Sequence, residues 1–362
     1  MPKSVLRRAA VSVTAVGVIA IAATPALAAG QTASGWQLVF SKQYPVKGSG
    51  PYSAFTAAAA VGPNDAWAVG GTSAAGSSGG RPIALRWDNG AWHQTWLPAR
   101  LGGILGAVSA PAANDVWAVS QLSQYVVHWN GKRWSIAKSW PESGLLDHQL
   151  TGVAAFSATN VWVFGGNGAD PGMGTWHLRG RTWTKVKGVS IDTASAVGPA
   201  NIWAIADGPD APGQLIEHYN GTKWSPVTHR GLAGFGYNAI LAVSARSVWL
   251  GGTVTTKTSQ QVPELARWDG HGWRQVPLKL PVGTYPDSMT ADGHGGFWLN
   301  AYGRKYQWAV HVSANGKTSR IGLPTAPARA IPIPGSSSLW AVGAIERRTG
   351  WDASIWLHGS RP

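Results

Sequence analysis

The chain has 362 residues, of which 22 are tryptophan and 47 are glycine, and it contains no cysteine. Disulfides and a lipidated N-terminal cysteine are therefore excluded, so an exported form depends on a large apolar core for its stability. Only 13% of the residues are charged, but the formal net charge is +14. Such a surface attracts polyanions, among them teichoic acids, acidic glycans, phospholipid headgroups and nucleic acids, or it serves only solubility.

The first 28 residues form a predicted signal peptide. Lys3, Arg7 and Arg8 precede the uncharged run Ala9–Ala23, which is too short to span a bilayer, and Ala26-Leu27-Ala28 offers small residues for cleavage. The Arg7-Arg8 pair leaves both general secretion and twin-arginine export open. We expect a secreted, extracellular monomer with no membrane span, whose partner is not nucleic acid.

Residues 29–362 are organised by a repeat. A tryptophan within a short apolar run occurs seven times, at intervals of 50, 45, 41, 46, 49 and 42 residues. These residues are Trp67, Trp117, Trp162, Trp203, Trp249, Trp298 and Trp340. A period of roughly 40–50 residues is typical of one blade of a β-propeller.

Each repeat contains four predicted antiparallel strands, called a to d in chain order, with the repeated tryptophan on strand b. A tight hairpin between strands c and d is indicated by pairs such as Asn130-Gly131 before Trp134. Strand b is apolar on both faces, as in Val116–Val119, which is expected when neighbouring sheets cover it on both sides. The sequence therefore predicts an all-β, seven-bladed propeller. Its blades are expected at residues 52–97, 103–140, 149–189, 190–228, 237–280, 286–324 and 328–359.

The two ends of the chain together complete the last repeat. That repeat ends after a strand c that contains Trp356, whereas residues 35–41, with Trp36, have the pattern of a strand d. We therefore predict that the N-terminal strand pairs with the last blade. This velcro closure removes the exposed sheet edges that promote aggregation.

Basic residues recur at one position of strand c. They are Arg86, His128, His177, His218 and Arg267. A ring of blades keeps these side chains too far apart to share one metal ion, so we expect a repeated structural hydrogen bond and neither a metal nor a cofactor.

An apolar strand b that runs into Gly-Gly, as at Gly70-Gly71 and Gly165-Gly166, resembles the repeats of kelch-type propellers, including the central domain of galactose oxidase. The aromatic-Asn/Asp-Gly-x-x-Trp pattern is similar to that of bacterial and fungal seven-bladed propeller lectins. This resemblance covers nearly the whole mature chain and implies a fold, whereas function depends on the site. The copper chemistry of galactose oxidase is excluded, because it needs a cysteine cross-linked to a tyrosine.

Antiparallel order places the b–c loops and the d–a connections on one face, which carries the longer and more variable loops. Our candidate ligand-binding residues are Tyr302, Arg304, Lys305, Arg347, Arg348 and Trp351. They belong to the sixth and seventh blades, which are neighbours in a ring, so they predict one sector that stacks on a sugar and pairs with its anionic groups. Each could instead be an ordinary solvated loop residue. Further candidates on this face are Asp147, His148, Asp170, Asp207, Asp210, His229, Arg230, Phe235, Tyr237, Tyr285, Asp287 and Asp352.

Catalytic motifs are scarce. The four glutamates form no paired-carboxylate motif, and no Gly-x-Ser-x-Gly, His-Glu-x-x-His, phosphate-binding or calcium-binding motif occurs. We predict a non-catalytic binding protein for a glycan or an anionic envelope polymer. The alternatives are a scaffold for another secreted protein and a carbohydrate-active lyase, hydrolase or epimerase.

Overall fold

The computed structural model describes residues 35–46, 50–74, 80–120, 124–140, 149–166, 174–207, 214–325 and 328–362. Every regular element within these ranges is a β-strand, which confirms the prediction of an all-β chain. In the same ranges we find no helix long and apolar enough to cross a membrane. The predicted signal peptide lies outside the described residues.

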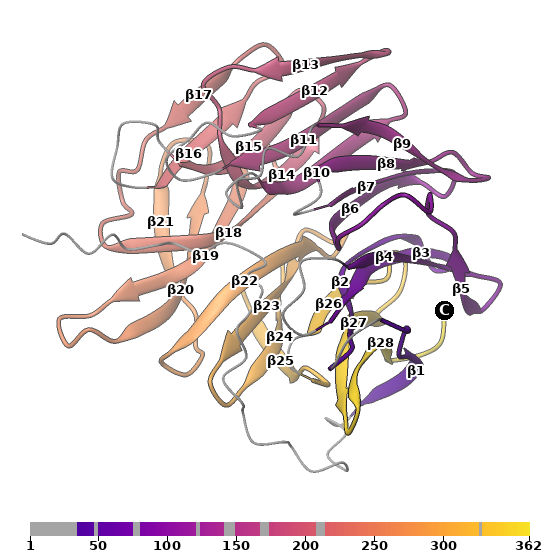
Figure 1. The fold of residues 1–362 in the computed structure, drawn as a ribbon. Helices are drawn as coiled ribbons and strands as arrows, with labels where there is room; N and C mark the ends of the chain where they lie inside the picture. Colours follow the sequence, from indigo (N-terminus) through magenta and orange to yellow (C-terminus); the bar gives the residue numbers. More distant parts are fainter. Residues whose placement is uncertain are drawn as a thin grey trace, which may run out of the picture.

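The strands form groups of four, which we call units 1 to 7 and which are labelled by strand in Figure 1. Units 2 to 6 are separate four-stranded sheets, whereas units 7 and 1 share one eight-stranded sheet.

Unit 1 comprises β2 (Tyr52–Gly62), β3 (Asp65–Ser73), β4 (Arg81–Asp88) and β5 (Ala91–Thr95). Unit 2 comprises β6 (Leu105–Ala112), β7 (Asp115–Ser120), β8 (Tyr125–Trp129) and β9 (Trp134–Ser139). Unit 3 comprises β10 (Gln149–Ser157), β11 (Asn160–Gly166), β12 (Thr175–Arg179) and β13 (Thr182–Val186). Unit 4 comprises β14 (Ile191–Gly198), β15 (Asn201–Asp207), β16 (Gln214–Tyr219) and β17 (Trp224–Val227). Unit 5 comprises β18 (Phe235–Ser244), β19 (Ser247–Thr255), β20 (Gln261–Trp268) and β21 (Trp273–Pro277). Unit 6 comprises β22 (Thr284–Ala291), β23 (Phe297–Gly303), β24 (Gln307–Val312) and β25 (Thr318–Gly322). Unit 7 comprises β26 (Ala328–Pro332), β27 (Leu339–Arg347), β28 (Gly350–His358) and β1 (Trp36–Lys42).

The hairpin between the third and fourth strands of a unit depends on the predicted Asn-Gly pair. In unit 2 the Asn130 side-chain oxygen accepts hydrogen bonds from the backbone N–H groups of Lys132 and Arg133, at 3.1 and 3.0 Å. Gly131 has a φ of 89°, a left-handed conformation that L side chains rarely adopt. The local sequence therefore favours closure of this turn.

The N-terminal strand lies beside the C-terminal one. β1, indigo in Figure 1, pairs antiparallel with the yellow β28, from Trp36 opposite His358 to Lys42 opposite Ala353. A parallel bridge between Tyr52 and Trp351 links units 1 and 7. The first strand of each unit contacts the first strand of the next, and β26 contacts β2, so these contacts run in a circle.

Aromatic clusters hold adjacent units together. Trp67 of unit 1 lies 5.3 Å from Trp129 and 5.4 Å from Trp134 of unit 2, measured between ring centroids. Trp340 of unit 7 packs in the same way on two tryptophans of unit 1. Six of the seven repeated tryptophans are therefore buried core, as the two-sided apolar pattern of the second strands predicts, and Trp298 is partly buried.

Four of the five basic residues of the third strands make the expected structural hydrogen bonds, whereas the Nε of Arg267 has no partner among the described residues and its guanidinium lies over the ring of Trp249. His128 bonds to Asp115 at 2.8 Å and stacks on Trp117 with ring centroids 4.1 Å apart. Equivalent bonds join His177 to Asn160 and His218 to Asn201. These side chains thus fix the second strand of their own unit, so they are not free to bind a ligand.

Candidate functional site

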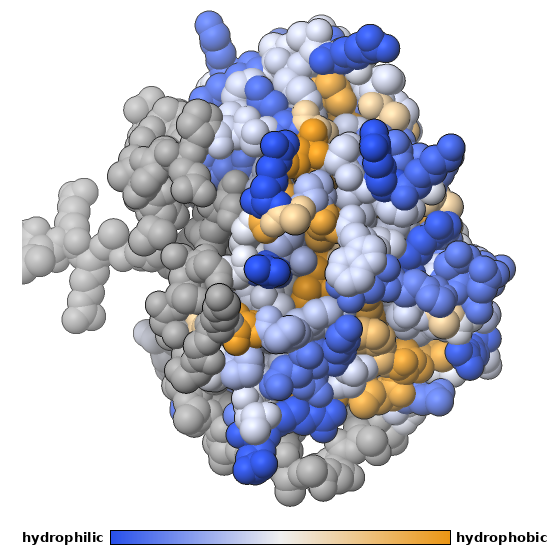
Figure 2. Space-filling model, turned by 45° about the vertical axis from the view of Figure 1, so that its right-hand side comes forward, coloured by the Kyte–Doolittle hydropathy of each residue, from blue (hydrophilic) through white to orange (hydrophobic). Residues whose placement is uncertain are grey.

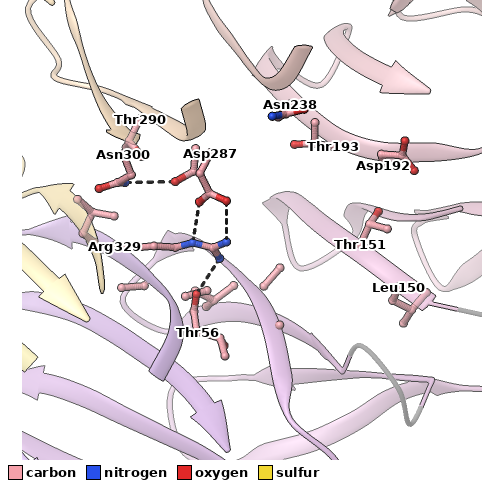
Figure 3. Close-up of a pocket in the computed structure, with 17 residues that line it drawn as sticks. Thr56, Leu150, Thr151, Asp192, Thr193, Asn238, Asp287, Thr290, Asn300 and Arg329 are labelled. Atoms are coloured by element: carbon pink, nitrogen blue, oxygen red, sulfur yellow. Dashed lines mark hydrogen bonds and ion pairs between the residues drawn. The ribbon is translucent and has the colours of Figure 1, made fainter. Parts of the chain in front are cut away.

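A cavity of about 250 Å³ lies where the first strands of all seven units meet. We call it the central cavity. Its lining comes from β2, β6, β10, β14, β18, β22 and β26, together with Asn300 of β23. Figure 3 shows Arg329, Asp287 and Asn300 on one side of it and Thr151, Asp192 and Asn238 on another.

One position of the repeat places a residue from every unit on this cavity. That position lies eleven residues before the repeated tryptophan, and in six units the residue is passed over in strand pairing as part of a β-bulge. We call these residues the ring residues. They are Thr56, Gly106, Thr151, Asp192, Asn238, Asp287 and Arg329. Because a bulge redirects its side chain, the irregularity supplies the cavity with polar groups.

Several ring residues also connect neighbouring units. Thr56 donates a hydrogen bond to the backbone oxygen of Leu105 at 2.5 Å, and Thr151 donates to that of Ile191 at 2.7 Å. In each case the acceptor immediately precedes the ring residue of the next unit. The ring thus contributes to holding the inner strands together as well as to lining the cavity.

The strongest polar contact in the cavity joins Arg329 to Asp287. Arg329 Nε donates to Asp287 Oδ2 at 3.0 Å, Nη2 donates to Oδ1 at 3.4 Å, and Nη1 donates to the backbone oxygen of Thr56 at 3.0 Å. One guanidinium therefore links units 6, 7 and 1. Burial is the largest single influence and lowers the pKa of Arg329, but attraction to Asp287 and Tyr302 and the hydrogen bonds with them together raise it, so the guanidinium stays protonated.

Asn300 supports the same side of the cavity. Its side chain is 2% exposed, accepts a hydrogen bond from Ala330 N–H at 2.9 Å, and donates to the backbone oxygen of Ala330 at 3.0 Å. It also donates to Ser288 Oγ at 3.2 Å. Because Ser288 and Ala330 each directly follow a ring residue, Asn300 holds Asp287 and Arg329 in their relative positions.

The predicted site residues divide into two groups. Tyr302 was expected in a loop but lies within β23, where its hydroxyl donates to the backbone oxygen of Ala328 at 2.5 Å. Burial raises the pKa of this hydroxyl, so it stays protonated. Trp351 lies within β28 and packs on Tyr52, with ring centroids 5.8 Å apart. Both side chains support the site from within the fold.

The cations of the predicted sector are at the surface. Arg304 and Lys305 lie between β23 and β24, and Arg347 and Arg348 lie at the β27–β28 hairpin; all four are exposed. Arg347 pairs with Asp352 at 3.0 Å, whereas the ion pairs among the described residues do not include the other three. Arg304, Lys305 and Arg348 are therefore available to an anion.

These cations lie beside one end of the central cavity, which we call the mouth. Thr284, at the start of β22, pairs with Gly303, the residue before Arg304, and Asp287 lies three residues further along β22. On unit 7, Ala328 pairs with Gly343, from which β27 continues to Arg347. The loops of units 6 and 7 thus flank the end where the first strands begin.

Other candidates on this face have different positions. Phe235 and Tyr237 are buried in β18, so they are core residues. Asp287 was expected in a connection but is a ring residue of β22. Asp147, His148, Asp170 and Asp210 lie outside the described residues. Sequence reasoning overlooked the ring position, although its spacing of eleven residues from each tryptophan is present in the sequence.

The cavity has three ionisable side chains among its lining residues. They are Asp192, Asp287 and Arg329, and Asp287 is committed to the ion pair. Among the described residues no group of three or more His, Asp and Glu side chains is placed to hold a metal. The lining therefore offers hydrogen-bonding groups together with one ion pair.

Neither a family model nor a curated protein matches this sequence. Several solved structures match the fold. YCF48 bound to D1 peptide is 12% identical, with a TM-score of 0.58 over 90% of this chain and 97% of that one. A catalytically inactive virginiamycin B lyase from Staphylococcus aureus with quinupristin is 10% identical, with a TM-score of 0.59 over 90% of this chain and 100% of that one. The extracellular domain of BT4673 from B. thetaiotaomicron is 11% identical, with a TM-score of 0.56 over 90% of this chain and 40% of that one.

These likenesses identify the class of fold. The chain is a β-propeller, in which the four-stranded units are the blades. At 10–12% identity these likenesses show the fold, and one fold hosts many functions.

Proposed function

We propose that this protein is a secreted, non-catalytic binding protein built as a single kelch-like ring of seven blades. Units 1 to 7 would be those blades, and β1 would close the ring on β28, which is supported by their antiparallel pairing. Secretion would follow removal of residues 1–28. We expect the mature chain to act as a monomer without a cofactor.

The proposed ligand is an acidic polysaccharide or another anionic envelope polymer, bound at the mouth of the central cavity. The observation that carries this proposal is that Arg304, Lys305 and Arg348 are exposed and have no ion-pair partner among the described residues. Tyr285 and Tyr306, exposed by 45% and 52%, lie on the same unit as Arg304. Aromatic faces beside cations suit a sugar that carries negative groups.

Two other functions have weaker support. A peptide-binding scaffold is favoured by the neighbour that is bound to a peptide. On the face shown in Figure 2, however, apolar area forms a narrow strip and one wider patch, both bordered by protruding hydrophilic side chains, so an apolar partner surface would meet charged groups as well. A lyase is suggested by another neighbour, but the cavity lacks a converging acid and base among its lining residues.

Retention on immobilised polygalacturonate tests the proposal. We expect the Arg304→Ser/Arg348→Ser variant to elute at a lower salt concentration than the parent. Arg347 is left unchanged because it is paired with Asp352. The matched control is Arg230→Ser/Lys257→Ser, which removes two exposed cations from loops on the same face of units 4 and 5.

Salt dependence separates specific charge contacts from unrelated changes. The difference between variant and parent should shrink as salt rises, because the screening length falls from about 10 Å at 0.1 M to about 3 Å at 1 M. Identical elution of the variant and its control would remove the mouth of the cavity from consideration.

A further inference from the structure

A second hollow lies far along the blades from the central cavity, between units 3 and 4. We call it the rim groove; its volume is about 430 Å³. Unit 3 contributes residues of β11, β12 and β13, and unit 4 contributes residues of β16 and β17. These outer strands lie next to each other in the upper part of Figure 1.

The groove is open because small side chains face it. In β13, Trp183 points toward unit 2, where it contacts Trp117. Alternation along the strand therefore directs Thr184 and Val186 toward unit 4. They face Trp224, whose ring forms part of the apolar floor.

An indole N–H in this floor has no acceptor. In unit 2 the Nε1 of Trp134 donates to the Thr95 hydroxyl of unit 1 at 3.0 Å. Val186 takes the place of that threonine opposite Trp224, and the Trp224 Nε1 is buried without a partner among the described residues. The Nε1 of Trp162, a residue that is 2% exposed and also lines the groove, is likewise unpaired there. A valine also lies at the equivalent position opposite Trp273, whose Nε1 is likewise unpaired. The unpaired indole N–H therefore distinguishes this groove only in combination with its cations.

Three cations surround the groove, and no lining residue is acidic in the part of the chain that the structure describes. Arg179 ends β12, Lys187 follows β13, and Lys223 precedes β17; all are exposed. The repeat shows that this combination is particular to the interface of units 3 and 4. At the same three positions between units 4 and 5 the residues are Asn220, Thr228 and Gly272, and between units 1 and 2 they are Asp88, Trp96 and Arg133.

Arg179 is held in place by its neighbours. Its Nε donates to His177 Nδ1 at 3.2 Å, and its Nη2 donates to the Tyr219 hydroxyl of unit 4 at 2.9 Å. His177 Nε2 in turn contacts Asn160 Oδ1 at 2.9 Å. A guanidinium has five N–H donors in one plane, and only two of them are used in these bonds. Because the two bonds already fix the Arg179 side chain, its remaining donors can bind a ligand with little further loss of side-chain entropy.

We infer that the rim groove is a second binding site, which takes an anionic saccharide unit of about disaccharide size. The sugar ring would lie against Trp224 and Val186, its hydroxyls would bond to Thr184 and Thr222, and its sulfate or carboxylate groups would pair with Arg179, Lys187 and Lys223. The volume falls within the range of roughly 300–1,000 Å³ that is usual for small-ligand pockets. This site is independent of the one proposed at the mouth of the central cavity.

The test is calorimetric titration of the mature protein with a trisulfated heparin disaccharide and with the same disaccharide after desulfation. We expect the Lys187→Ser/Lys223→Ser variant to bind the sulfated sugar at least about tenfold more weakly than the parent. The two substitutions should cost little folding stability, because both side chains are exposed. The matched control is Arg133→Ser/Lys279→Ser, which removes two other exposed cations, one each from units 2 and 5.

Equal affinity of Lys187→Ser/Lys223→Ser and its control for the sulfated sugar would overturn the proposal. So would equal binding of the desulfated sugar, or tighter binding of an acidic peptide of the same charge. Arg304→Ser/Arg348→Ser should bind the disaccharide like the parent, so a failure at the cavity mouth and a failure at the rim groove give different results.

Discussion

Arg329 and Asp287 form an ion pair across the boundary between units 7 and 6, with Nε 3.0 Å from Oδ2. Arg329 also donates to the backbone of unit 1, so this pair fastens three inner strands at the mouth of the cavity. Both side chains keep about a third of their surface exposed, 28% and 32%. Solvent therefore weakens the attraction, and the hydrogen bonds provide much of the gain.

Arg329→Ala should lower the free energy of unfolding by about 1–3 kcal/mol, because it leaves Asp287 and the Thr56 carbonyl without a partner. A double-mutant cycle with Asp287→Ala, measured by denaturant unfolding, should give a coupling energy of about 1 kcal/mol. Additive effects of the two substitutions would show that the contact is not formed in solution.

Removal of residues 29–45 should lower the melting temperature of the whole protein. The deletion takes away β1, exposes the edge of β28, and removes the Trp36 indole that donates to the Gly322 carbonyl at 2.7 Å. Deletion of residues 29–34 alone retains β1 and serves as the control. If both deletions melt at the temperature of the parent, β1 does not close the ring.

Trp117→Ala should cost about 3–5 kcal/mol in unfolding free energy, the usual effect of emptying a large aromatic site. Trp117 is 2% exposed and stacks on His128. Trp96 is 78% exposed, so Trp96→Ala should change the stability by less than about 0.5 kcal/mol. Chemical denaturation of both variants measures the contrast, and similar losses would contradict the assignment of Trp117 to the core.

Acid should destabilise the protein through His177. Burial first, and the nearby Arg179 second, lower the pKa of His177 from 6.5 to about 4. In the unfolded chain His177 binds a proton near pH 6.5, whereas in the folded protein it does so only near pH 4. The contribution of neutral His177 to folding stability is therefore complete above pH 6.5 and is lost as the pH falls toward 4.

In the His177→Gln variant the fall in stability between pH 6.5 and 4 should be less steep, by up to about 1 kcal/mol per pH unit. His271→Gln, at an exposed turn, provides the control. Denaturant unfolding at several pH values gives the slopes. An unchanged slope in His177→Gln would mean that this histidine titrates alike in the folded and unfolded chains.

The fold was predictable because its main determinants are local and repeated. Seven apolar segments around a tryptophan, most of them followed by a Gly-containing stretch, indicate the order of strands before any tertiary contact is known. The pairing partner of Trp36 was also deducible, because one repeat lacks its last strand. Spacing alone carries this information.

The lining of the cavity was harder to predict, because it depends on the pairing register. Thr56 and Asn238 face the cavity at bulges, and alternation by itself does not indicate where a strand departs from its ladder. We expected Tyr302 in a loop, but β23 extends past it because Tyr302 pairs with β22, and the sequence pattern does not indicate how far that pairing runs. Loop residues such as Arg304 were identified correctly as exposed, since charge and turn residues are sufficient for that inference.

The bulges on the inner strands have a consequence for variation. Six of the ring residues have no partner in the strand ladder, so a substitution there changes the lining of the cavity without removing a ladder pair. Thr56 and Asn238 could therefore be exchanged for other side chains while the tryptophan interfaces stay intact. A combinatorial library at the six bulge positions would therefore keep every ladder pair and vary the chemistry of the lining, at a cost in stability wherever the replaced side chain, like that of Thr56, also bonds to the next unit.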